Sequence, residues 1–125
     1  MTGTKDPIDG MQISELIVKG IQEKKGSDIV ILNLKDVGNA IADYFVICTG
    51  NSDSQINALA NSIEETVFKS TSQGPWHREG LKNKEWVLLD FVDVVVHIFR
   101  KDAREFYALE DLWGDAAITK IEEDF

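Results

Sequence analysis

The chain has 125 residues, 43% of them hydrophobic and 28% charged, which indicates one globular domain with its own core and excludes a disordered chain. Its 22 acidic and 13 basic residues give a formal net charge of −9. This charge favours a basic partner and disfavours direct, sequence-specific binding to nucleic acid. No apolar run approaches the roughly 20 residues that span a bilayer, and residues 1–10 lack a signal-peptide pattern. We therefore expect a cytoplasmic protein without a membrane partner.

The N-terminal region predicts a tail followed by a helix. Residues 1–8 are expected to form a flexible tail. Asp9 followed three residues later by Gln12 is typical of a capping box, and the apolar residues beyond fall on one helical face. Gly26 favours the end of this helix.

Two β-rich runs and a second amphipathic helix come next. Residues 28–34 and 44–49 are continuous apolar runs, which predict two buried strands. Ser52 and Gln55 have the spacing of another capping box. The apolar residues beyond them form a clear stripe, so we expect a helix over 53–70.

The following segment predicts three strands. Because Pro75 cannot donate a hydrogen bond to a central ladder, we expect a short edge strand at 76–78. The apolar runs 86–91 and 94–99 are joined too tightly for a crossover, so they should pair antiparallel as a hairpin. A strand-helix-strand unit earlier in the chain requires a parallel crossover, and the sheet is therefore predicted to be mixed.

A last helix is expected after the hairpin. Asp102 and Glu105 have capping-box spacing, and the helix should end near Trp113. Phe106 and Leu109 share one stripe with Trp113 and are the residues expected to enter the core.

The element order predicts a single α/β domain over residues 9–113, in which helices flank a mixed sheet of about five strands. The acidic segment 114–125 is expected to fray as a C-terminal tail.

The cysteine and histidine content limits the chemistry that we expect. Cys48 is the one cysteine and lies in the apolar run YFVIC, which favours a buried hydrophobe over a reactive thiol. His97 in VVVHIF is interpreted as a hydrogen-bonded core histidine rather than a ligand, and His77 is expected to be exposed. These three residues cannot build a metal site without carboxylates, and the chain has no glycine-rich nucleotide loop. We therefore expect no metal and no cofactor.

Three motifs, in the same order, carry a resemblance to a known family. They are ADYFVICTGNSDSQINALANSIEE at 42–65, PWHREG at 75–80, and WVLLDFVDVVVHIF with REFYALEDLW at 86–113. In these motifs the chain resembles the ribosomal silencing factor family, also called the Iojap-like family. The resemblance covers roughly residues 12–113.

The resemblance implies a nucleotidyltransferase-like architecture and a function that needs no enzyme chemistry. A member of this family is expected to bind the large ribosomal subunit through large-subunit ribosomal protein fourteen. It would sterically block joining of the small subunit and so repress translation under nutrient limitation, as in stationary phase. The family also implies a possible homodimer.

Charged and aromatic residues surround the predicted hairpin and its following helix, and we expect them to meet at one end of the sheet. Asp90 and Asp93 flank the hairpin turn, where they are interpreted either as turn residues or as acidic contacts for a basic partner. The residues predicted to bind the partner are Trp76, Glu79, Asp90, Asp93, Tyr107, Glu110 and Trp113.

An alternative function rests on the turn Gly50-Asn51-Ser52, between a predicted strand and a predicted helix. Such a helix start can hold a phosphate, which would suit a nucleotide-binding protein or a nucleotidyltransferase. Those enzymes also need paired carboxylates for magnesium. Here Asn51 interrupts the Gly-Ser turn and no Asp-x-Asp follows, so a structural helix cap is favoured.

Overall fold

A computed structural model describes residues 9–122, and the predicted tail 1–8 lies outside this range. The helices and strands, in chain order, are α1 (Gly10–Glu23), β1 (Ser27–Asn33), β2 (Tyr44–Gly50), α2 (Asp53–Thr71), β3 (His77–Glu79), β4 (Trp86–Asp90), β5 (Val94–Arg100), α3 (Lys101–Tyr107), α4 (Leu109–Leu112) and β6 (Ala117–Lys120).

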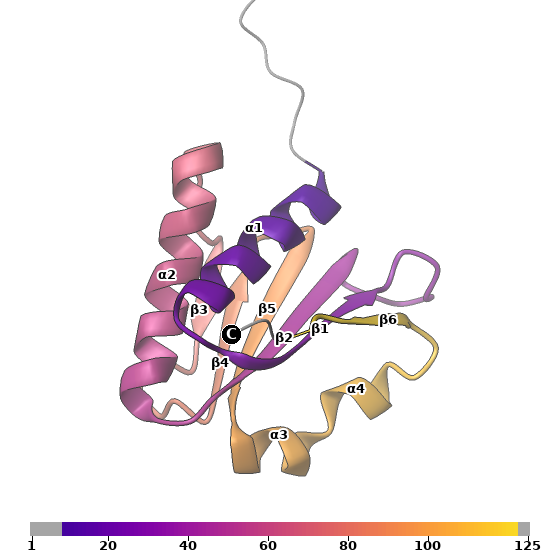
Figure 1. Cartoon of the computed structure of the whole chain (residues 1–125). Coiled ribbons are helices and arrows are strands. Elements are labelled where there is room, and N and C mark those ends of the chain that lie inside the picture. Colours follow the sequence, from indigo (N-terminus) through magenta and orange to yellow (C-terminus); the bar gives the residue numbers. More distant parts are fainter. Residues whose placement is uncertain (1–8, 123–125) are drawn as a thin grey trace, which may run out of the picture.

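The strands form one six-stranded sheet in the order β3-β4-β5-β2-β1-β6. Helices α1 and α2 pack side by side on one face of this sheet, and the short helices α3 and α4 lie on the other side (Figure 1). The predicted α/β class with a mixed sheet is confirmed, with one strand more than expected.

The first helix begins as the sequence predicts. The Asp9 carboxylate accepts a hydrogen bond from the Gln12 N–H at 2.9 Å, and the Gln12 side chain accepts one from the Asp9 N–H at 3.0 Å. Both halves of the capping box are therefore present, and two of the unpaired N–H groups at the helix start are satisfied.

The start of α2 differs from a full capping box. Ser52 caps the helix by accepting from the Gln55 N–H at 3.1 Å, but the Gln55 side chain accepts from Asn51 rather than from Ser52. The same side-chain amide donates to the carbonyls of Lys24 and Lys25. Gln55 thus joins the start of α2 to the chain that leaves α1.

The strand pairing follows the predicted connections. β4 and β5 form an antiparallel hairpin, and β5 pairs parallel with β2 after the crossover that contains α2. β3 pairs with β4 and lies at the edge of the sheet that the described residues form, as expected after Pro75.

The predicted fraying of residues 114–125 is wrong for the described part of that segment. Residues 117–120 form β6, which pairs antiparallel with β1 and places Lys120 opposite Val30. The Ile121 N–H extends the ladder by donating to the Ile29 carbonyl. The physical reason is that β1 has an open edge whose backbone groups need partners, and the acidic composition of the segment does not reveal this.

The predicted last helix is interrupted. Ala108 adopts a left-handed conformation with φ +46°, and this residue separates α3 from α4. The capping box predicted for this helix is absent, because Arg100 is the N-cap and makes no side-chain cap. Asp102 instead accepts from the Arg100 guanidinium at 3.2 Å.

The break also changes which side chains enter the core. Leu109 is buried, as predicted, whereas the expected core residue Phe106 is 81% exposed. The left-handed residue redirects the chain after α3, so Phe106 and Leu109 no longer share one continuous helical face.

The core has one apolar layer on each face of the sheet. The layer beneath α1 and α2 includes Ile17, Ile21, Val46, Leu59, Ile63 and Ile98. The layer on the opposite face includes Leu32, Phe45, Ile47, Val95, Phe99 and Leu109. Within residues 9–122, no helix is long and apolar enough to cross a membrane.

Candidate protein-binding site

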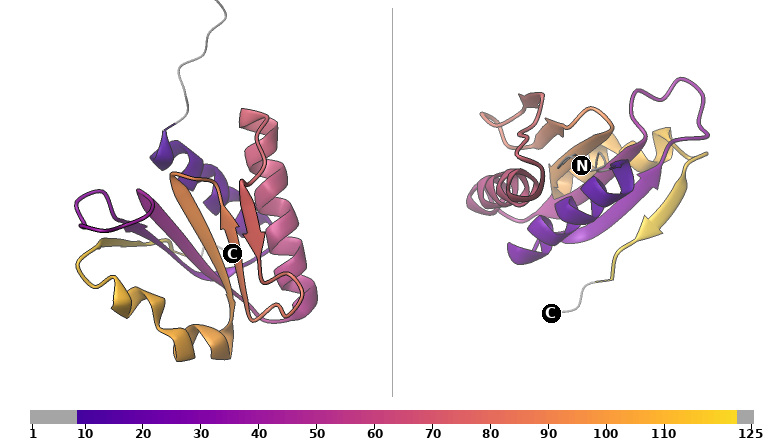
Figure 2. Two further views of the ribbon diagram at one scale, coloured as in Figure 1. Left: turned by 180° about the vertical axis from the view of Figure 1, so that it is seen from behind. Right: turned by 90° about the horizontal axis from the view of Figure 1, so that it is seen from above.

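One part of the sheet has no helix over its second face. Seen from behind, α3 and α4 lie toward one side of this face and leave β3 and β4 uncovered (Figure 2). The register pairs His77 with Asp90 and Glu79 with Leu88, so these side chains point to the same side. We call the following residues the open face: His77, Glu79, Trp86, Leu88, Asp90 and the adjoining Tyr107.

The alternation of side chains along β3 and β4 defines this face. Arg78 points the other way, because its guanidinium binds the Glu64 carboxylate on α2 at 2.7 and 2.8 Å. Val87 and Leu89 are fully buried in the layer beneath the helices, whereas Leu88 is half-buried. The strand therefore supplies core residues to one face and a partly exposed apolar surface to the other.

Trp86 and Tyr107 form the aromatic centre of the open face. Their ring centroids lie 4.8 Å apart, and the Trp86 ring lies 5.0 Å from that of Phe99 beneath it. Tyr107 is 40% exposed and Trp86 is half-buried. Aromatic side chains held in this way expose a rigid apolar surface at little entropic cost, as is common at protein interfaces.

Glycine is required at the turn that leads into Trp86. Gly80 has φ +84°, and a Cβ atom at this position would lie 1.9 Å from the Trp86 carbonyl oxygen. Only glycine permits this close approach between the end of β3 and the start of β4. The Glu-Gly pair of the PWHREG motif thus has a structural task next to the open face.

Beneath the open face, His97 is buried and holds Trp86 through a hydrogen bond. The indole N–H of Trp86 donates to His97 Nδ1 at 2.9 Å. Burial lowers the pKa of His97 from 6.5 to about 3, so the ring is neutral at physiological pH. The predicted hydrogen-bonded core histidine is confirmed.

Two acidic groups lie elsewhere on the open face, Glu79 on β3 and Asp90 at the hairpin end of β4. Glu79 lies 3.6 Å from the exposed His77 ring. Asp90 accepts a hydrogen bond from the Val92 N–H at 2.7 Å, so its side chain has the turn role that was one of its two interpretations.

The expectation that all predicted site residues meet at one end of the sheet is wrong. Asp90 and Asp93 lie at the hairpin turn, whereas Tyr107, Glu110 and Trp113 follow the opposite end of β5. A strand of seven residues separates the two groups by about 20 Å. The turn before a strand and the helix after it must lie at opposite ends, which closeness in sequence conceals.

The two predicted tryptophans, Trp76 and Trp113, also lie apart from each other. Trp76 lines a hollow of about 380 Å³ on the helix side, next to Ile13 and Val67. Trp113 packs edge-on against Phe45 of β2 with ring centroids 5.7 Å apart. The structure thus brings Glu79, Asp90 and Tyr107 onto the open face and places Trp76 elsewhere.

The sequence reasoning missed Trp86 and Leu88 as surface residues. Their run WVLLDF is almost continuously apolar, a pattern that is typical of a buried strand. The signal that could have identified them is Trp86 itself, a large side chain with a polar N–H at the start of the run.

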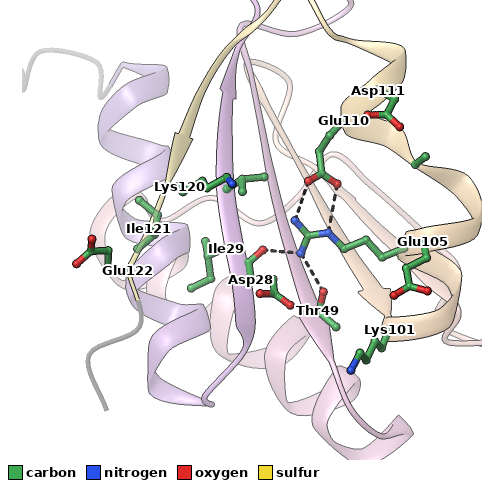
Figure 3. Close-up of a pocket in the computed structure, with 13 residues that line it drawn as sticks. Asp28, Ile29, Thr49, Lys101, Glu105, Glu110, Asp111, Lys120, Ile121 and Glu122 are labelled. Atoms are coloured by element: carbon green, nitrogen blue, oxygen red, sulfur yellow. Dashed lines mark hydrogen bonds and ion pairs between the residues drawn. The ribbon is translucent and has the colours of Figure 1, made fainter.

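A groove of about 860 Å³ lies beside α3 and α4, and Arg104 occupies its floor. Its guanidinium donates to Glu110 at 3.1 and 3.2 Å, to Thr49 Oγ1 at 2.9 Å and to the Asp28 carbonyl. Figure 3 shows Glu110, Asp28 and Thr49 converging there. The predicted site residue Glu110 is therefore committed to an internal ion pair.

The geometry gives no support to the alternative function at Gly50-Asn51-Ser52. The Ser52 hydroxyl is used as a helix cap, as the structural interpretation predicted. The carboxylates of the hairpin turn are also far from this loop. Gly50 pairs with Arg100 at one end of β2, whereas the Asp93 carbonyl accepts from the Tyr44 N–H at the other end, about 20 Å away. In residues 9–122 no three His, Cys, Asp or Glu side chains stand close enough to hold a metal.

The fold and the open face define a mixed α/β domain that presents a partly apolar surface with acidic neighbours. The family model described as "Ribosomal silencing factor during starvation" matches residues 7–125. The chain belongs to this ribosomal silencing factor family, and the predicted resemblance is confirmed.

Individual relatives agree with this assignment over most of their length. A ribosomal silencing factor of Halalkalibacterium halodurans is 39% identical over 115 residues, which cover 92% of this chain and 97% of that protein. A ribosomal silencing factor of Bacillus subtilis is 39% identical over 88% of this chain and 92% of its own length. A crystal structure from Chromobacterium violaceum, 33% identical, superposes with a TM-score of 0.80 and covers 86% of this chain and 88% of that one.

Proposed function

We propose that this protein binds the large ribosomal subunit through its open face and thereby blocks joining of the small subunit. The act is steric, because two large bodies cannot occupy one interface, and it requires no chemical transformation. The observation that carries the proposal is the aromatic pair Trp86 and Tyr107, held rigidly on an uncovered sheet face. Family membership supports the ribosome as the target.

The partner on the subunit is proposed to be large-subunit ribosomal protein fourteen, as the family resemblance implies. A net charge of −9 favours approach to a basic protein. On the open face, Glu79 and Asp90 would meet basic groups of the partner, while Leu88, Trp86 and Tyr107 supply the apolar contact. Trp113 stays a predicted contact residue, whereas Glu110, which is held by Arg104, lies outside this contact together with Trp76 and Asp93.

The proposed function also includes a cellular location, a growth condition and an oligomeric state. The protein acts in the cytoplasm when nutrients are scarce, and it forms a homodimer, for which the family resemblance is the support. The exposed edge strand β3 offers backbone groups through which two copies could pair. Analytical ultracentrifugation of the pure chain should show a dimer, and a monomer at all concentrations would contradict this part.

The test of the binding face is co-sedimentation of the protein with purified large subunits. Leu88→Asp and Tyr107→Ala should each weaken binding at least tenfold, because each removes apolar contact from the centre of the interface. Phe68→Ala is the matched control, since Phe68 is an exposed aromatic residue on α2 and lies outside the open face. Unchanged binding by the folded open-face variants would move the site elsewhere on the molecule.

A further inference from the structure

Within residues 9–122, the side chain of His97 makes one hydrogen bond, and that bond goes to a residue of the open face. Its Nδ1 accepts the Trp86 indole N–H at 2.9 Å. Its Nε2 is buried and has no partner among the described residues. The His97 ring is 3% exposed and lies edge-on to Phe45, with ring centroids 4.6 Å apart.

A histidine is a costly residue at this position. Burying an imidazole N–H without a partner is unfavourable, whereas an apolar residue of similar volume would bury its surface favourably. The neighbours of the ring are apolar or aromatic, so the layer itself does not need a polar atom. The group that obtains a hydrogen-bond acceptor from His97 Nδ1 is the indole N–H of Trp86.

We propose that His97 is a positioning residue, which fixes the indole ring of Trp86 in the orientation that the partner meets. The bond to Nδ1 prevents rotation of the indole ring and holds it next to Tyr107. Because Nδ1 is the acceptor, the proton of the neutral imidazole resides on Nε2. This inference rests on the proposed function, since it concerns the face that binds the large subunit.

The same bond determines the chemistry that Trp86 can offer. Its N–H is the indole's only donor and is already used, so a partner can meet only the ring carbons. The partner group over Trp86 is therefore aliphatic or cationic, such as the stem or head of an arginine, and not a hydrogen-bond acceptor.

The test is a double-mutant cycle, measured as affinity for purified large subunits. His97→Leu removes the acceptor and should weaken binding about tenfold, while His97→Asn, which places an oxygen near Nδ1, should recover part of the loss. In a Trp86→Phe background, which has no indole N–H, His97→Leu should change the affinity less than twofold. An equal loss in both backgrounds would overturn the proposal, because His97 would then act only through the core.

A spectroscopic readout on the wild-type chain is independent of variant folding. The Trp86 indole N–H should exchange slowly in NMR experiments, and the nitrogen shifts of His97 should report the tautomer with the proton on Nε2. Rapid exchange of the indole N–H would overturn the inference.

If Trp86→Ala leaves large-subunit binding unchanged, the proposed binding face is wrong. If the Trp86 variant loses binding to the large subunit but the His97 variants bind normally, the proposed binding face is correct and the positioning role of His97 is wrong.

Discussion

Arg104 and Glu110 form a two-bonded ion pair across the left-handed residue that separates α3 from α4, with nitrogen–oxygen distances of 3.1 and 3.2 Å. The same guanidinium reaches the Asp28 carbonyl on β1 and the Thr49 hydroxyl on β2. The Arg104 side chain thus attaches both short helices to the sheet. Tyr107 lies between Arg104 and Glu110 in the chain, at the end of α3.

Replacing Arg104 with Met should destabilise the fold. The change leaves the Glu110 carboxylate and the Thr49 hydroxyl partly buried without their partner, which costs about 2–4 kcal/mol in free energy of unfolding. Urea denaturation measures this loss. Lys69→Met is the control, because Lys69 pairs with Glu65 at the exposed surface and should give no measurable change. An Arg104→Met variant as stable as the wild type would refute the proposed connection.

Val92→Gly should stabilise the protein. Val92 has φ +75° at the hairpin turn, a conformation that strains a β-branched residue, and its side chain is 59% exposed, so little burial is lost. We expect a gain of about 1 kcal/mol in free energy of unfolding, measured by thermal or urea denaturation. Asn39→Gly is the control: Asn39 has φ +69°, which asparagine tolerates. A less stable Val92→Gly variant would show that the turn is not strained.

His97 should make stability depend on pH. The unfolded chain binds a proton at this residue below its ordinary pKa of 6.5, but the folded chain does so only near pH 3. The stability due to neutral His97 is therefore fully present above pH 6.5 and is lost as the pH falls from 6.5 toward 3. A folded His97→Asn variant should lose less stability than the wild type between pH 6.5 and about 4.5, by at most about 1.4 kcal/mol per pH unit. Parallel pH profiles for the two proteins would contradict the low pKa.

Cys48 should be unreactive in the folded protein. It is fully buried, and burial raises the pKa of its thiol to about 12. At pH 8 a thiol reagent should label it only after denaturation, because the thiolate is the reactive form. Rapid labelling under native conditions, measured by mass spectrometry, would show that β2 opens readily.

The features that local chemistry determines were predictable from the sequence. The capping residues Asp9 and Ser52, the buried Cys48 and the core position of His97 follow from residue type and apolar pattern within a few positions. The tight connection between β4 and β5 likewise leaves an antiparallel hairpin as the one arrangement.

The features that depend on distant partners were not predictable. The strand β6 exists because β1 offers an open edge, and the short β-branched pair Ile118-Thr119 does not by itself specify that pairing. Ala108 in a left-handed conformation has no sequence marker comparable to glycine, so the break after α3 and the exposure of Phe106 were missed.

In the candidate site, too, the residue types could be chosen from the sequence but their positions in space could not. Tyr107 and Glu79 were selected from the sequence, but their placement beside Trp86 depends on the register of β3, β4 and β5. That register also separates Asp93 from Tyr107, which sequence proximity could not reveal.

The most direct test of the central claim is sedimentation of mixed large and small ribosomal subunits in the presence of the pure protein. At saturating protein the account predicts that joined ribosomes disappear, while the protein migrates with the large subunit. The open-face variant Tyr107→Ala should leave joining intact. Undiminished joined ribosomes at saturating wild-type protein would contradict the proposed mechanism.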